Sequence, residues 1–282
     1  MRKSIFLVAV LAAIFCGAAN AQVLLGLPYE KIHTANRKAV PYQIEREADV
    51  MWSKVVWRRI ELSERANQHL YFPTTPQDGR MSLIDVILEG IHTQGLTAYQ
   101  EGNGNEFCTI ITEKEVHEKM GASQELLPKY SLDGEELPPT MVPIPYNSSE
   151  VKSYLLKEVW FYDKQRSVMD VRILGLCPLR TYYRADDIDQ ERPLFKPTFW
   201  IYYPEARSIL ANAECFNVMN DASRLNFDDV FQKRLFSSYV YAESNVYDNR
   251  MVSEYAVGQD CLLEADRIKN NIGNFEQDIW DY

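Results

Sequence analysis

Residues 158–178, EVWFYDKQRSVMDVRILGLCP, contain two extended runs separated by a polar turn, and this pattern decides the fold. The first run, Val159–Tyr162, is aromatic and β-branched, and charged and polar residues at 163–167 interrupt it. In the second run, Val168–Leu176, successive residues fall on opposite faces, as side chains do along a β-strand. The stretch therefore predicts a central β-hairpin, and no step of catalysis is visible in it.

The same stretch also carries a family resemblance. Together with PTFWIYYP at 197–204, ANAECFN at 211–217 and LNFDDVF at 225–231, it resembles the PorN/GldN family. The resemblance covers essentially the whole mature chain. It implies a non-enzymatic periplasmic subunit of the type IX secretion system, tied to gliding motility in bacteria that glide.

The resemblance also implies partners. Family members assemble with an outer-membrane lipoprotein, PorK or GldK, into a large ring below the outer membrane. They also contact the periplasmic part of the inner-membrane motor protein, PorM or GldM. The implied role for this chain is thus a homo-oligomeric ring subunit that is peripheral to the outer membrane through a PorK/GldK-like lipoprotein.

Residues 1–21 predict a signal peptide. Arg2 and Lys3 precede an apolar run at 5–15, and Ala19-Asn20-Ala21 is a small-x-small cleavage site. The run is too short to span a bilayer, which needs about 20 apolar residues. We therefore expect cleavage after Ala21 and export to the periplasm.

The mature chain is acidic. The full sequence has 30 Lys and Arg against 40 Asp and Glu, and cleavage removes Arg2 and Lys3, which leaves a net charge of −12. This charge argues against nucleic-acid binding, which needs a basic surface, and against electrostatic adsorption to an anionic membrane. Because no later segment looks apolar enough to span a bilayer, membrane attachment is expected to come through another protein.

Four cysteines remain after cleavage, at 108, 177, 215 and 261. An even number in an oxidising compartment permits disulfides, and the wide spacings do not resemble a zinc site. Cys177 with Cys215 is the first candidate for a disulfide, because both lie in the segment expected to fold as one unit. Buried free thiols are the alternative.

Residues 22–42 are expected to form an extended N-terminal arm, because Pro28 and Pro41 punctuate a stretch with little periodicity. In a ring-forming protein, such an arm could reach a neighbouring subunit. A mobile terminus is the alternative.

Residues 43–62 are predicted to form a helix. Acidic residues lead and basic residues trail, which complements the helix dipole. Trp52 and Trp57 lie on this segment, either as core residues or as an interface anchor. The apolar stripe consists of Ile44, Ala48, Met51, Val55, Ile60 and Leu62.

Capping residues predict four further helix starts. They are Ser82, Thr112 with Glu115 three residues later, Asn147 leading to Leu156, and Asn226 leading to Phe236. Strands are expected at 199–203 and 237–242. The tail at 261–280 has apolar residues at near-helical spacing and predicts a helix that weakens at Gly273.

The proline-rich stretch at 128–145 is the expected boundary between two parts, and a loop inside a single domain is the alternative. We therefore predict an α+β fold. A mainly helical part at 43–145 is followed at 146–282 by a small antiparallel or mixed sheet with flanking helices.

The sequence contains no recognisable catalytic, cofactor-binding or metal-binding motif. His117-Glu118 begins like HExxH, but position 121 is Gly. Asp186, Asp187 and Asp189 lack the glycine and glutamate of a calcium loop. A secreted hydrolase with a carboxylate pair is the second functional hypothesis.

Overall fold

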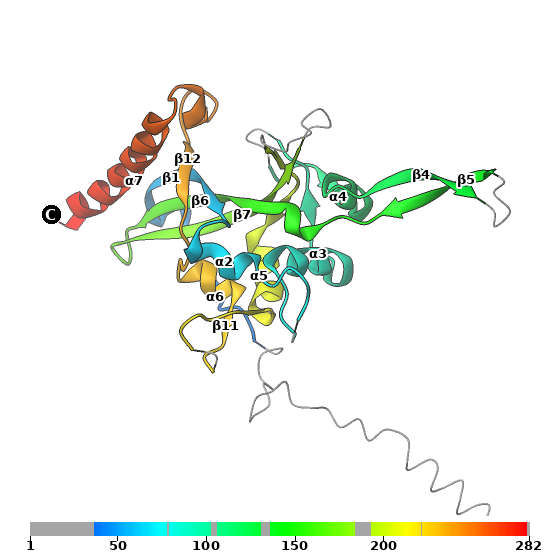
Figure 1. Ribbon diagram of the computed structural model, residues 1–282. Helices are drawn as coiled ribbons and strands as arrows, with labels where there is room; N and C mark the ends of the chain where they lie inside the picture. Colours follow the sequence, from blue (N-terminus) through cyan, green and yellow to red (C-terminus); the bar gives the residue numbers. More distant parts are fainter. Residues whose placement is uncertain are drawn as a thin grey trace, which may run out of the picture. The chain divides into compact units, whose positions relative to one another are not determined.

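The computed structural model describes residues 37–77, 79–102, 106–130, 136–183, 193–220 and 222–280 (Figure 1). The predicted signal peptide, the first part of the arm up to residue 36 and the acidic stretch at 186–189 lie outside these ranges.

The predicted central hairpin is confirmed. Its strands are β6 (Val151–Asp163) and β7 (Val168–Tyr182), which pair antiparallel around a turn at 164–167. Ser167 closes this turn with a φ of 53°, in the left-handed region. Both strands are longer than the sequence pattern indicates, with 13 residues in β6 and 15 in β7.

The hairpin is the centre of an eight-stranded sheet with the order β12-β1-β6-β7-β9-β2-β3, and β8 also pairs with β7 (Figure 1). All pairings are antiparallel. The other strands of this sheet are β1 (Val50–Glu61), β2 (Ala98–Tyr99), β3 (Ile110–Ile111), β8 (Leu194–Pro197), β9 (Trp200–Tyr202) and β12 (Tyr239–Glu243). Two smaller sheets pair β4 (Ser123–Tyr130) with β5 (Glu136–Ile144), and β10 (Glu214–Cys215) with β11 (Leu225–Asn226).

The expected fold, a mostly helical N-terminal part followed by a small sheet, is wrong. The segment at 43–62 that predicts a helix contains strand β1, which lies between β12 and β6 in the large sheet. Strands β2 and β3 also come from the part that was expected to be helical. One antiparallel sheet therefore contains strands from both sides of the proline-rich stretch.

Strand β1 resembled a helix because both of its faces are covered. Val56 packs in one hydrophobic cluster, and its neighbour Trp57 packs in another on the opposite face. Apolar residues on both faces remove the simple alternation of a half-buried strand. The apolar positions then also fit a period of 3.6 residues, although the valines and tryptophans favour a strand.

Six α-helices accompany the sheets in the described ranges. They are α2 (Gln68–Tyr71), α3 (Leu83–Gln94), α4 (Glu113–Lys119), α5 (Tyr203–Asn212), α6 (Phe227–Gln232) and α7 (Gln259–Trp280).

Three of the predicted caps are confirmed. Ser82 and Asn226 accept hydrogen bonds from backbone N–H groups of α3 and α6, and Thr112 forms a capping box with Glu115 at α4. Asn147 caps only a 3-10 turn, Ser148–Glu150, and the helix expected to follow it is instead strand β6.

The hydrophobic core follows the register of the strands. Leu156, Leu176, Ile201, Ala98 and Ile111 are successive partners across five strands, and all are buried. Helices α3, α5 and α6 pack on this row in the main cluster. On the same face, Ala265, Ile268 and Ile272 of α7 pack against Val56 and Val240. The opposite face carries a smaller cluster of Trp57, Cys177, Trp200 and Ala242.

A buried carboxylate interrupts the apolar face of β6. Glu158 is fully buried, and Arg234 donates to both of its carboxylate oxygens, at 2.9 and 3.2 Å. Trp160 Nε1 also donates to this carboxylate at 3.2 Å. Arg234 follows α6 with a φ of 53°, which helps to end the helix at Gln232, before the predicted Phe236.

Removing this partner should be costly. We expect Arg234→Ala to lower the free energy of unfolding by about 3–5 kcal/mol, because it leaves the buried Glu158 carboxylate without its ion-pair partner. Urea unfolding measures the change. The matched control is Arg267→Ala, because Arg267 pairs with Glu264 on the exposed surface of α7, where an ion pair contributes less than about 1 kcal/mol. Equal losses in the two variants would contradict this assignment.

Candidate functional site

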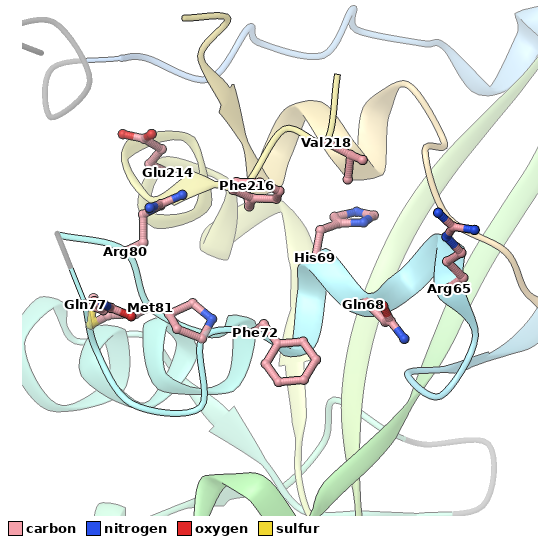
Figure 2. A pocket seen from close by; sticks show the side chains of 11 residues that line it. Arg65, Gln68, His69, Phe72, Gln77, Arg80, Met81, Glu214, Phe216 and Val218 are labelled. Carbon is pink, nitrogen blue, oxygen red and sulfur yellow. The ribbon is translucent and has the colours of Figure 1, made fainter. Parts of the chain in front are cut away.

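A groove lies between α2 and β10, and we call it the α2–β10 groove (Figure 2). Its volume of about 610 Å³ is within the range of ligand clefts in proteins. One wall comes from α2 and the chain that follows it, and the other comes from β10 and the residues after it. The lining residues are Arg65, Gln68, His69, Phe72, Pro73, Gln77, Arg80, Met81, Glu214, Phe216 and Val218.

The α2 wall is fixed by a buried asparagine. Asn67 immediately precedes α2 and is completely buried. Its side-chain amide donates to the carbonyls of Glu61 and Ser237, at 2.8 and 2.9 Å, and accepts from the backbone N–H of Ser237 at 2.8 Å. Because these bonds satisfy the amide and tie it to the ends of β1 and β12, they position the start of α2.

The β10 wall is fixed by the short β10–β11 ladder and by a thiol. Cys215 pairs with Leu225 in the ladder, and its Sγ lies 3.5 Å from the carbonyl oxygen of His69, to which it can donate. The thiol is buried, and burial raises its pKa to about 12. It therefore stays protonated at neutral pH and connects the two walls as a weak donor.

The surface of the groove is apolar with charged positions of both signs, because Glu214 lines it together with Arg65 and Arg80. Phe72, Phe216 and Val218 are 52%, 44% and 75% exposed, so they present apolar area to solvent. The Arg80 guanidinium lies 5.4 Å from the centre of the Phe216 ring, and Figure 2 shows Arg65 at the other end of the groove.

His69 is the titratable base of the groove. Its Nε2 is buried and has no hydrogen-bond partner among the described residues. Burial lowers the pKa of the imidazole, and a hydrogen bond to the backbone of Ala66 opposes this shift. The neutral form is therefore favoured in the folded chain.

A second hollow of about 310 Å³ lies on the opposite face of the sheet, beside Trp57, Trp200 and Tyr241. Its buried carboxylate, Glu106, accepts from Trp57 Nε1 at 2.9 Å and from Lys157 Nζ at 2.6 Å. These contacts satisfy Glu106 within the chain. We therefore assign the cluster to stability rather than to ligand binding.

The two tryptophans singled out as interface candidates both pack inside the chain. Trp57 is 6% exposed and belongs to the cluster with Cys177. Trp52 stacks on Phe275 of α7, with ring centres 4.6 Å apart and planes at 28°. Each ring thus has an intramolecular partner, on opposite faces of β1.

The cysteines of the candidate disulfide are buried free thiols in the structure. Cys177 lies on β7 in the cluster with Trp57, whereas Cys215 belongs to the main cluster that packs on the other face of the sheet. The sheet thus separates the two side chains. Burial also raises the pKa of the Cys177 thiol well above its usual range.

An exposed apolar stretch precedes and begins α7, and we call it the α7 surface. Sequence periodicity identified the helix but not the surface, because the exposed residues are partly in the loop before it. The members are Val246, Tyr247, Met251, Tyr255, Val257, Leu262 and Leu263, which are 42–90% exposed. These residues are close in the sequence, and exposed apolar residues that gather into a patch mark protein interaction sites.

Comparison with protein-family models gives a match. The family model described as gliding motility associated protein GldN matches residues 45–281, which is most of the chain. No curated protein matches. Among the residues that the structure describes, no helix has both the length and the apolar character to cross a membrane.

The buried imidazole predicts a pH effect. The unfolded chain protonates His69 near its ordinary pKa of 6.5, and the folded chain does so only at lower pH. In that window the unfolded state binds more protons, so stability falls as the pH falls. We expect wild type to lose more stability than His69→Gln between pH of about 7.5 and about 5.5, where the unfolded histidine titrates. Chemical denaturation at both pH values measures this. Equal losses would show that His69 does not contribute to the pH dependence of stability.

The thiols predict a pattern of alkylation. Iodoacetamide should modify exposed Cys108 quickly in the folded chain and leave Cys177 and Cys215 unmodified, because both are buried and protonated. Unfolding without a reductant should then make both reactive, as intact mass spectrometry would show. If both stayed unmodified until a reductant was added, they would form the disulfide instead.

Proposed function

The chain belongs to the GldN family, and on this premise we propose that it is a non-enzymatic structural subunit of the periplasmic ring of the type IX secretion system. The observation that carries the proposal is the family match over residues 45–281. A family associated with gliding motility supports a role in a secretion and motility complex with protein partners.

We propose three kinds of contact for the subunit. It assembles with copies of itself and with a PorK/GldK-like lipoprotein, and it contacts the periplasmic part of a PorM/GldM-like motor protein. The lipoprotein holds it at the outer membrane. The net charge of −12 that follows from the predicted cleavage fits this arrangement, because an acidic chain is not drawn to anionic lipid by itself.

The α7 surface supports a role in assembly. Helix α7 buries Ala265, Ile268 and Ile272 against the sheet, while Leu262 and Leu263 are 58% and 66% exposed. The helix thus has apolar side chains on its covered side and on its free side. Because exposing apolar area to water is unfavourable, we assign the free side to contact with the lipoprotein.

The first test is the mass of the complex. Light scattering should give a complex much heavier than one mature chain when the protein is co-expressed with its candidate lipoprotein partner, because assembly requires both. The chain purified alone is the reference. A monomer in both samples would contradict the ring assignment and favour a secreted hydrolase instead.

The second test concerns the α7 surface. Leu262→Asp with Leu263→Asp should weaken the affinity for the lipoprotein at least about tenfold, because it replaces two apolar contact residues with charges. A tenfold loss of affinity corresponds to about 1.4 kcal/mol of binding free energy. Co-purification with the lipoprotein measures the loss. Asn270→Asp with Asn271→Asp is the control, since it adds the same charge at two exposed positions of the same helix. Equal binding by the two variants would remove the surface from the interface.

A further inference from the structure

Strands β4 and β5 form a two-stranded sheet that is separate from the eight-stranded sheet, and we call it the β4–β5 ribbon. The two strands pair antiparallel, from Ser123 opposite Ile144 to Tyr130 opposite Glu136. At about 3.3 Å per residue, strands of this length make a ribbon about 26 Å long. Among the helices and strands that the structure describes, each strand of the ribbon has more than isolated contacts only with the other.

Such a ribbon needs a further contact to be stable. An isolated two-stranded hairpin is marginally stable at best in water, and it becomes stable when more strands join it or when another element packs on it. Within the described part of the chain, the ribbon has neither a third strand nor an element packed along it. The missing contact is therefore expected from another molecule.

The base of the ribbon is fixed to the rest of the subunit. Before β4, Gly121 has a φ of 101°, which favours glycine, and the guanidinium of Arg180 on β7 lies too close to it for a Cβ atom. After β5, Tyr146 packs on the main cluster, and Arg180 Nε donates to Glu150 at 2.5 Å. One arginine thus contacts the chain on both sides of the ribbon, and the ribbon leaves the subunit at a fixed place.

Prolines limit how a partner can bind to the ribbon. Pro128 lies in β4, and Pro138, Pro139 and Pro143 lie in β5. Because proline has no backbone N–H, it interrupts the row of donors with which an added strand would pair, and prolines protect edge strands in this way. We therefore expect the ribbon to pack on a folded surface rather than to accept an extended peptide as a third strand.

We propose that the β4–β5 ribbon is the arm through which each subunit packs on the next copy of the same chain. This inference rests on the proposed function. An arm of one copy on the body of the next joins two different surfaces, and such heterologous contacts can close into a ring. The α7 surface stays free for the lipoprotein, so one copy can hold both partners at once.

A shortened ribbon tests the proposal in the full mature chain. Replacing residues 125–142 by Asn-Gly keeps the two pairs nearest the base and closes them with a two-residue turn. We expect this variant to bind the candidate lipoprotein as wild type does, but light scattering should give a complex with one copy of the chain. The circular dichroism melting curve should match that of wild type, because the ribbon has only isolated contacts with the other described elements.

Photo-crosslinking in the wild-type complex identifies the partner. Benzoylphenylalanine in place of Leu127 on β4 should link the chain to a second copy, and mass spectrometry identifies the product. The matched control places the same probe at Leu263 on the α7 surface, where it should link to the lipoprotein.

Two results would overturn the inference alone. One is a shortened variant that assembles to the mass of wild type, and the other is a probe on the ribbon that links only to the lipoprotein or to its own chain. A wild-type chain that stays monomeric with the lipoprotein would contradict the proposed function, and this inference with it.

Discussion

The buried carboxylate of Glu158 fixes the register on which the sheet depends. Strand β6 pairs with β1 on one side and with β7 on the other, and Glu158 is fully buried where it meets Arg234. A shift of one residue would turn Glu158 to the opposite face, toward the Trp57 cluster, and would separate it from its only ion-pair partner in the described chain. An unpaired buried charge costs several kcal/mol. The alternative register is therefore excluded by electrostatics as well as by hydrophobic burial.

Structural features that depend on a few neighbouring residues could be predicted from the sequence. Features that depend on pairing within the sheet could not. Ser82, Thr112 and Asn226 cap helices as predicted, because a cap needs only the next three residues. Asn147 has the same signal, but its segment continues into β6, where pairing on both sides outweighs a local cap. Strand β1 shows the same effect over twelve residues, since the clusters on its two faces are formed by elements distant in the sequence.

The groove could not have been predicted from the sequence, because its two walls are 146 residues apart in the chain, and the polar contacts that hold them leave no periodic pattern. Asn67 connects α2 to Ser237, and Cys215 contacts the carbonyl of His69. Neither residue belongs to a recognisable motif. Trp57 illustrates the converse, because a conspicuous aromatic residue in the sequence is satisfied internally by Glu106. A family resemblance was visible in long segments, but it did not indicate which surfaces are free.

The two ends of the described chain differ in the side chains that they leave free to contact a partner. At the N-terminal end, Arg37 and Tyr42 are already bonded to α6. At the C-terminal end, α7 covers the sheet with one side and leaves Leu262 and Leu263 exposed on the other. A partner contact made by a segment without fixed structure would have to order that segment, at a cost of about 1–2 kcal/mol for each residue fixed. A preformed helix surface avoids most of that entropy, and this is the physical reason to place the partner contact at α7.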